Sequence, residues 1–205
     1  MVAWLSEAQK MNHVESHEEA STDRVMFGFW IYLMTDLLMF AALFAVFAVL
    51  RNNTAGEPSG KDIFSLPFVL IETLILLTSS FTCGLGMIAA RNKDKAKVML
   101  WFGVTMLLGL IFLTLEIKEF STILHEGHSW RDSAFLSSFF VLVGTHGLHI
   151  TSGILWLAVT LRYIARQGLN HHKIRKLALI SLFWHFLDIV WIFIFTVVYL
   201  MSFIN

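Results

Sequence analysis

Five long stretches of this sequence are almost free of charge. They are Val25–Leu50, Leu66–Ala90, Val98–Leu115, Ser133–Leu161 and Leu177–Ile204. The chain has 15 basic and 15 acidic residues, yet only Asp36, Glu72 and Asp188 lie within these stretches. A helix needs about 20 mainly apolar residues to cross a bilayer, whereas a core helix of a soluble protein is shorter and carries an apolar stripe. The sequence therefore predicts an integral membrane protein.

The composition excludes several other classes of protein. Hydrophobic residues make up 57% of the chain and charged residues only 15%, against about 25% in soluble domains. These figures exclude a disordered chain, a disulfide scaffold and a nucleic-acid binder that relies on bulk positive charge. The single Cys83 cannot form an intrachain disulfide, and we expect it to pack as a small hydrophobic residue. The N-terminal segment lacks the pattern of a cleavable signal peptide, so the first stretch is expected to be an uncleaved signal anchor.

We predict an all-α, polytopic protein with one domain, at residues 25–204, after a polar tail at residues 1–24. Its five transmembrane helices are expected at about residues 25–50, 66–90, 98–117, 133–161 and 177–204. Eleven Lys and Arg residues fall on the side of the N-terminal tail and four on the opposite side. The positive-inside rule then places the N-terminus in the cytoplasm and the C-terminus in the periplasm. The short polar segment Arg91–Lys95 makes the second and third helices antiparallel neighbours.

Eight titratable side chains fall inside the predicted helices or at their ends. They are Asp36, Glu72, Glu116, Glu119, His146, His149, His185 and Asp188. The rise of 1.5 Å per residue places the three glutamates in the outer half of the bilayer or at its outer boundary, and the other five near its midplane. Ionisable groups in hydrocarbon are unfavourable unless they have a partner or a purpose. We therefore expect two polar layers that tie the helices together, with proton handling as the alternative role for Asp36.

Other interpretations of these residues stay open from the sequence. His146, His149 and His185 are candidate haem or metal ligands, but hydrogen bonding between helices is favoured because no cysteine cluster or carboxylate set accompanies them. Glu116 and Glu119 lie at a predicted helix end, where solvation is the ordinary outcome. The corresponding alternative functions are a self-sufficient membrane haem protein and a small proton-coupled carrier, although the chain has no inverted repeat.

The last helix carries an aromatic face. Trp184, Asp188, Trp191 and Phe195 follow at spacings of four, three and four residues, which places them on one side of a helix. We expect this face to pack against the helices of another protein. Glycines recur within the predicted helices, and small residues allow close helix approach in membranes.

Several motifs occur in order on successive predicted helices. The segment Gly144–Ile150 reads GTHGLHI and the segment Trp184–Trp191 reads WHFLDIVW. Together they resemble the signature pair of subunit III of the haem–copper terminal oxidases. Phe29–Asp36 resembles the segment that carries an embedded carboxylate in that family, and Glu116–Glu119 its Glu-x-x-Glu. The run Thr54–Phe64 is most similar to the cytochrome bo ubiquinol oxidase branch of the family.

The resemblance implies an accessory subunit of a respiratory terminal oxidase in the bacterial inner membrane. In this family the haems and copper belong to subunit I, and subunit III has no redox centre of its own. The implied partners are subunit I by direct contact, subunits II and IV, and phospholipids, with ubiquinol as the substrate of the complex and no nucleic acid. Family members are expected to stabilise the catalytic subunit and to support proton uptake. Many of the cytochrome c oxidase members of the family have Glu in place of Asp36, and longer members have two further N-terminal helices.

Overall fold

Helices are the only regular secondary structure among the residues that the computed structural model describes. These are residues 2–54, 65–127 and 130–204, with side chains described for residues 24–54, 65–127 and 130–203. The helices are α1 (Val2–Leu50), α3 (Leu66–Arg91), α4 (Lys95–His125), α5 (Ala134–Gln167) and α6 (His171–Ile194), followed by the π-helix η1 (Phe195–Leu200) and α7 (Met201–Ile204). Five helical segments are long and apolar enough to cross a membrane, which confirms the predicted multi-pass membrane protein.

The helices run past several of the predicted ends. Helix α4 continues to His125 and α5 to Gln167, about two turns beyond the expected stretches. Helix α1 extends back to Val2 through the segment expected to be a polar tail. The run of turn-forming residues after Asn52 lies mostly outside the described residues.

Local sequence accounts for most of the helix boundaries. Pro67 occupies the first turn of α3, where its missing N–H is not needed. Ser133 and Asn170 cap α5 and α6 by accepting hydrogen bonds from the Leu136 and Lys173 amides. Asp94 caps α4 in the same way by accepting from the Lys97 amide at 3.2 Å, and this hydrogen bond lowers the pKa of the exposed Asp94 carboxyl.

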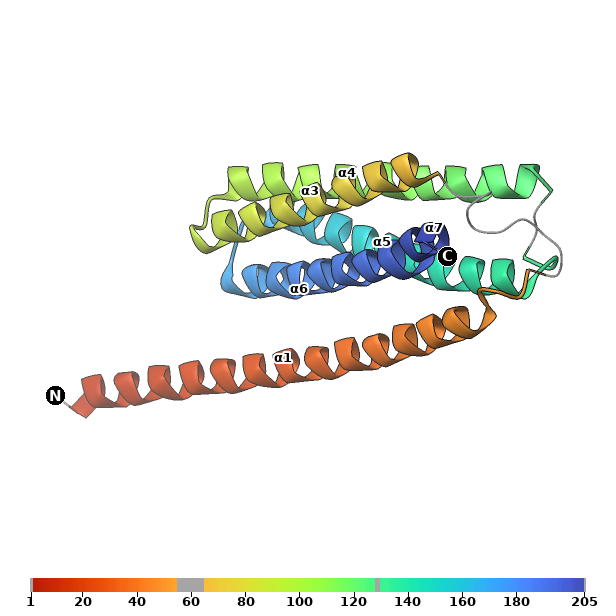
Figure 1. The fold of residues 1–205 in the computed structure, drawn as a ribbon. Helices are drawn as coiled ribbons and strands as arrows, with labels where there is room; N and C mark the ends of the chain where they lie inside the picture. Colours follow the sequence, from red (N-terminus) through yellow and green to blue (C-terminus); the bar gives the residue numbers. More distant parts are fainter. Residues whose placement is uncertain (1, 55–64, 128–129, 205) are drawn as a thin grey trace. The chain divides into compact units, whose positions relative to one another are not determined.

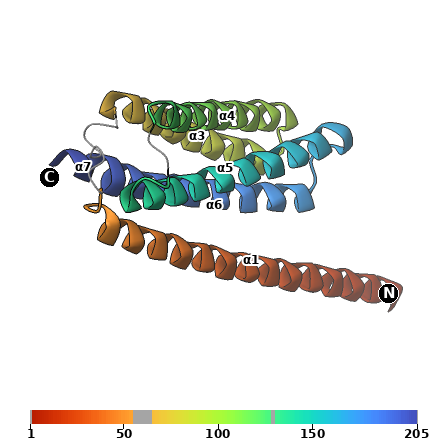
Figure 2. The ribbon, with the colours of Figure 1, turned by 90° about the vertical axis from the view of Figure 1, so that its right-hand side faces the viewer.

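The chain divides into two compact units, Met1–Leu38 and Met39–Asn205. In the second unit each of α3, α4, α5 and α6 has two main neighbours, in the cyclic order α3–α4–α5–α6. Figures 1 and 2 both show α3 and α4 as an antiparallel pair, as predicted, joined by a short turn. Lys93 supplies the left-handed backbone of that turn, with a φ of 56°.

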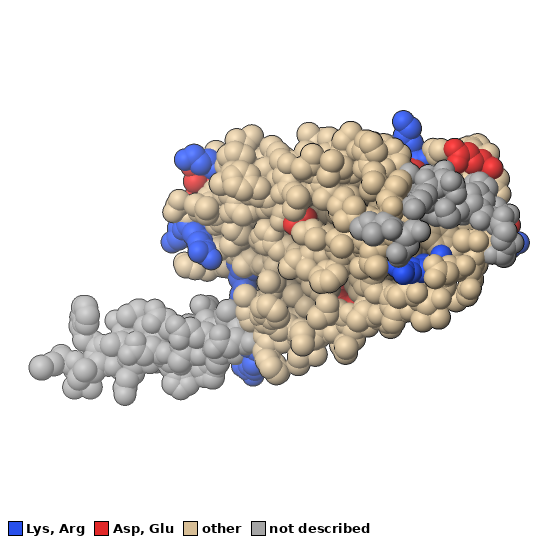
Figure 3. All heavy atoms as spheres, in the orientation of Figure 1, with Lys and Arg blue, Asp and Glu red and all other residues tan. Residues whose placement is uncertain are grey.

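The outer surface of the second unit suits a hydrocarbon environment. Fewer than half of the residues in the hydrophobic window of each of its four long helices are buried. On the face seen in Figure 3, the Lys and Arg side chains gather near the two ends of the helices and leave an almost uncharged band between them. Large apolar side chains on the long helices are exposed as well, among them Leu74, Phe81, Leu107 and Leu148.

The core of the second unit is dominated by aromatic rings. Trp184, Trp191 and Tyr199 are among the largest fully buried side chains. The C-terminal part of α1 also contributes, because Phe47 packs on Phe135 with ring centroids 5.9 Å apart.

Glycines make room for these rings. A Cβ added at Gly109 would lie 2.8 Å from the Trp184 ring, and one at Gly86 would lie 2.8 Å from the Phe102 ring. The glycines were predicted to allow close approach of helices. At Gly86 and Gly109, the group that comes close to the glycine backbone is an aromatic ring of another helix.

Gly109→Ala is expected to destabilise the protein by about 1–3 kcal/mol, because the new methyl group would lie 2.8 Å from the Trp184 indole, which is only 1% exposed, and would displace it. Thermal denaturation of the protein purified in detergent measures this change. Gly103→Ala on the same helix is the matched control, since a Cβ there meets nothing within 4 Å. Equal melting temperatures for the two variants would contradict the packing described here.

Candidate functional site

The polar side chains inside the second unit form two layers between α3, α4, α5 and α6. Because lipid offers no hydrogen bonds, each buried polar group needs a partner within the protein. Most of the partners come from hydroxyl groups on α3, which faces both α4 and α6.

The first layer is a hydrogen-bonded network at the middle of α3. The Ser79 hydroxyl donates to the Thr105 carbonyl of α4 at 3.1 Å, and the Thr82 hydroxyl is 2.9 Å from that of Thr105. The Trp184 indole of α6 donates to the Ser79 hydroxyl at 3.2 Å. Cys83 is buried and donates to the Ser181 hydroxyl at 3.5 Å, so it packs inside as expected. This layer joins three helices through short polar side chains.

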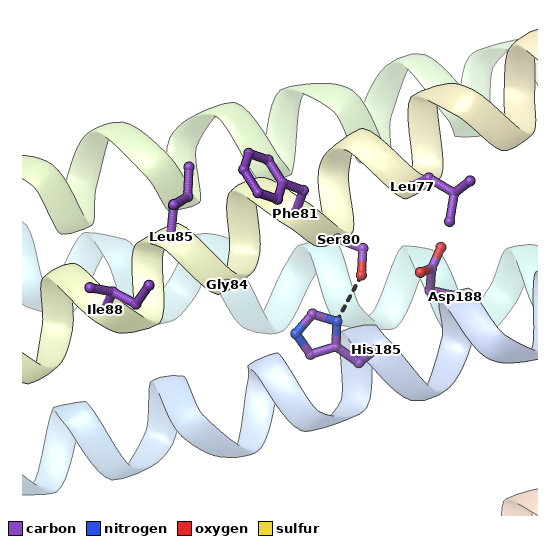
Figure 4. Close-up of a pocket in the computed structure, with 8 residues that line it drawn as sticks. All are labelled: Leu77, Ser80, Phe81, Gly84, Leu85, Ile88, His185 and Asp188. Atoms are coloured by element: carbon purple, nitrogen blue, oxygen red, sulfur yellow. Dashed lines mark hydrogen bonds between the residues drawn. The ribbon is translucent and has the colours of Figure 1, made fainter.

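Beside this network, His185 and Asp188 of α6 face Ser80 of α3. The Ser80 hydroxyl lies 2.7 Å from His185 Nδ1, and Figure 4 shows Asp188 next to this pair. Asp188 interacts with both Ser80 and His185, but its Oδ1 atom is buried without a hydrogen-bond partner among the described residues. The prediction that His185 and Asp188 share a helix face is confirmed here.

The second layer lies nearer the N-terminal end of α3, at Glu72 and Thr73. The Trp191 indole donates to the Thr73 hydroxyl at 3.1 Å, and the Tyr199 hydroxyl of η1 donates to Glu119 Oε2 at 2.9 Å. Glu72, Glu116 and Glu119 are close enough to interact electrostatically with one another and with Tyr199. Three carboxyl groups from α3 and α4 thus meet in one buried place.

Glu72 and Glu116 are the least satisfied members of this group. Glu72 is 0% exposed and Glu116 is 2% exposed, and neither carboxyl has a hydrogen-bond partner among the described side chains. Glu116 lies against Gly147, where an added Cβ would be 2.8 Å from Oε1. The expectation that Glu116 is solvated at a helix end is therefore wrong, because α4 runs more than two turns past it.

His146 and His149 differ in environment although they share a helix face. The His146 ring is fully buried and stacks on Trp191, with centroids 5.3 Å apart. Its two nitrogens have no hydrogen-bond partner in the described part of the chain. His149 instead has Nδ1 2.7 Å from the Thr145 carbonyl of its own helix. Within residues 24–54, 65–127 and 130–203, no three His, Cys, Asp or Glu side chains form a group that could hold a metal ion.

Asp36 belongs to the first unit. Its side chain interacts with that of Tyr32, one turn earlier in α1. Its proton-handling role stays a prediction.

The aromatic face of α6 points inward. Trp184 is 1% exposed and Trp191 is 0% exposed, and both indoles donate to hydroxyl groups of α3 in the same chain. The expectation that this face packs against another protein is therefore wrong. The hydroxyl partners Thr73, Ser79, Ser80 and Thr105 were not singled out from the sequence. For the three residues of α3, the signal is the recurrence of hydroxyl residues along that helix, which reads as an ordinary apolar helix unless its neighbours are known.

Known proteins resemble this chain over most of its length. The family described as cytochrome c oxidase subunit III matches residues 1–203. The chain is 52% identical to the cytochrome bo(3) ubiquinol oxidase subunit 3 of Pseudomonas aeruginosa, over 97% of this chain and 95% of that protein. It is 50% identical to the protein of that name from Pseudomonas putida, over 89% and 88% of the two chains. It is also 47% identical to a cytochrome c oxidase subunit 3 of Bacillus sp. strain PS3, over 87% and 86%.

Tyr199→Phe is expected to destabilise the protein by about 1–3 kcal/mol, since it leaves the part-buried Glu119 carboxyl without its hydroxyl donor. Glu119→Gln keeps an acceptor for Tyr199 and removes one of three neighbouring acidic groups, so it should be neutral or stabilising. Thermal denaturation in detergent ranks the two variants. A larger loss for Glu119→Gln than for Tyr199→Phe would contradict this account of the acidic group.

Proposed function

The chain belongs to the cytochrome c oxidase subunit III family, and on that basis we propose that it is the accessory, redox-centre-free subunit III of a proton-pumping quinol oxidase of the cytochrome bo type. The assembled complex oxidises ubiquinol and reduces oxygen to water. The chain itself contributes stability to the catalytic subunit, supports proton uptake and binds lipid.

One observation carries the accessory role. The buried polar side chains of the second unit are largely used to join α3 to α4 and α6, as in the bonds of Ser79, Thr73 and Ser80. A catalytic centre would instead direct such groups toward a common point where substrate binds. The arrangement supports a structural subunit whose outer apolar faces are available to partner helices and lipid.

Quinol is favoured as the electron donor of the complex by the relatives. Both Pseudomonas relatives, at 52% and 50% identity, are subunits of ubiquinol oxidases. The Bacillus relative, at 47% identity, belongs to a cytochrome c oxidase, so these quinol oxidase subunits lead by three to five percentage points of identity. The electron donor is a property of the complex, and the purified assembly decides it.

The proposed partners follow from the same assignment. Subunit I, which holds the haems and copper, is expected to contact this chain directly, with subunits II and IV completing the complex. We place the assembly in the bacterial inner membrane, with the N-terminus of this chain in the cytoplasm on the side of its eleven Lys and Arg residues.

Purification through a tag on this chain tests the function. The expected product is a membrane complex that contains a haem-bearing partner and consumes oxygen with ubiquinol. Expressed alone, the chain should show no Soret band. Recovery without a haem-bearing partner would overturn the proposal, as would a Soret band of the isolated chain that His146→Ala abolishes.

Trp191→Phe is expected to lower the yield of assembled complex while turnover per haem stays at the wild-type level. The substitution removes the hydrogen bond to Thr73 and leaves a space beside His146, at a cost of about 1–3 kcal/mol. Haem content per tagged chain and oxygen consumption per haem measure the two effects.

Trp130→Phe is the matched control, because Trp130 is 49% exposed. Normal yield with lost turnover in Trp191→Phe would show that this residue serves catalysis and not assembly.

A further inference from the structure

A groove with apolar walls runs along the outside of α3 beside α6. Its volume is about 370 Å³, and its walls are formed by Leu77, Phe81, Gly84, Leu85 and Ile88 of α3. Figure 4 shows the other lining residues, Ser80, His185 and Asp188, at the Leu77 end of the groove. The groove thus combines a polar end with a long apolar part.

The polar end lies near the middle of the membrane. Ser80 is 14 residues from the start of α3 and 11 from its end, or about 21 and 16 Å at 1.5 Å per residue. His185 is 14 residues from the start of α6, again about 21 Å. The hydrocarbon core of a bilayer is about 30 Å thick, so these side chains are far from both headgroup layers.

The polar end retains hydrogen-bonding capacity that the chain itself does not use. Ser80 and His185 bond to each other, while Asp188 is only 8% exposed and its Oδ1 has no hydrogen-bond partner among the described residues. A buried unsatisfied acceptor is destabilising by about 1–3 kcal/mol unless a donor reaches it. The Oδ1 atom is itself buried, but the Asp188 side chain lines the groove, so a ligand donor can approach the carboxyl where it faces the groove.

The floor of the groove is open at one position. Gly84 follows Ser80 by one turn on the same face of α3, and a Cβ added at Gly84 would meet nothing within 4 Å. In contrast, the neighbouring Gly86 faces the interior and has no room for a Cβ. Leu85 and Ile88 continue the apolar wall toward the Arg91 end of α3, with Ile88 58% exposed.

The depth of the polar end selects the chemistry of the occupant. A phospholipid carries its charged headgroup at the membrane surface and brings only acyl chain to the midplane, so it offers no donor to Asp188. An isoprenoid quinol is uncharged, carries two hydroxyl donors on its ring and moves within the hydrocarbon region. Its branched tail suits walls of Leu, Ile and Phe.

We propose that this groove binds a molecule of the ubiquinol pool, with the quinol ring at Ser80, His185 and Asp188 and the isoprenoid tail along Gly84 and Ile88. The inference rests on the proposed function, which supplies ubiquinol as the substrate of the complex. It is a binding site and involves no electron transfer, so the quinol exchanges with the membrane unchanged.

Photocrosslinking of the purified complex tests the proposal. The probe is a ubiquinone analogue with a photoreactive diazirine in its tail, reduced before illumination, and cross-linked peptides are identified by mass spectrometry. Labelling of the peptides that contain α3 and α6 is expected. An excess of short-chain ubiquinol should remove it, whereas an excess of phosphatidylethanolamine should not.

Gly84→Leu should lower this labelling by about tenfold or more, because the new side chain fills the floor of the groove. Gly103→Leu on α4 is the matched control, since that position is also open, and it should label as the wild type does. If Gly84→Leu lowers the yield of complex, Ile88→Trp at the exposed rim provides the same test.

Three results would overturn the proposal: labelling confined to other subunits, labelling that phosphatidylethanolamine displaces, or labelling that neither groove variant reduces. The wild-type complex is assayed first for a haem-bearing partner and for oxygen consumption with ubiquinol. Failure of that assay is a failure of the proposed function, whereas a fully active complex without groove labelling rejects the groove site alone.

Discussion

The second unit depends on hydrogen bonds between tryptophan indoles of α6 and hydroxyl groups of α3. In a bilayer, burying an apolar side chain between helices gains little over leaving it in lipid, so packing and polar contacts must hold the helices together. Trp184 bonds to Ser79 and Trp191 to Thr73, two turns apart on α6. Each indole also fills a large volume, and the glycine at 109 leaves room for one of them. The two tryptophans therefore pack α6 against α3 and also fix the register between these two helices.

This arrangement explains why buried titratable groups persist without forming a reactive centre. His146 stacks on Trp191, and Glu119 accepts a hydrogen bond from the Tyr199 hydroxyl. Glu72 and Glu116 lie beside Glu119 with no hydrogen-bond partner among the described residues. In the assembly proposed for this family member, such groups stay inside the subunit, and the outer apolar surface is available to partners and lipid. The groove at Ser80 and Asp188 differs because its polar end opens outward.

Sequence patterns were reliable where a single helix decides the outcome. The length of an uncharged stretch determines whether a helix can span hydrocarbon, so five spanning helices follow from the sequence alone. The shared face of His185 and Asp188 follows from their spacing, and the hairpin of α3 and α4 follows from the short segment between them. Helix ends were predicted less accurately. Helix α4 continues to His125, past the expected end at residue 117, through polar residues that a hydropathy criterion excludes.

Only the tertiary structure decided which way each face turns. A row of tryptophans around Asp188 is compatible with packing on another protein or on its own chain, since periodicity identifies a face but not its neighbour. The hydroxyl groups that receive the indoles lie more than 100 residues away in sequence. The burial of Glu116 against Gly147 and the open space at Gly84 likewise depend on how separate helices meet. Helix formation is local, whereas the satisfaction of a buried polar group is a property of at least two helices.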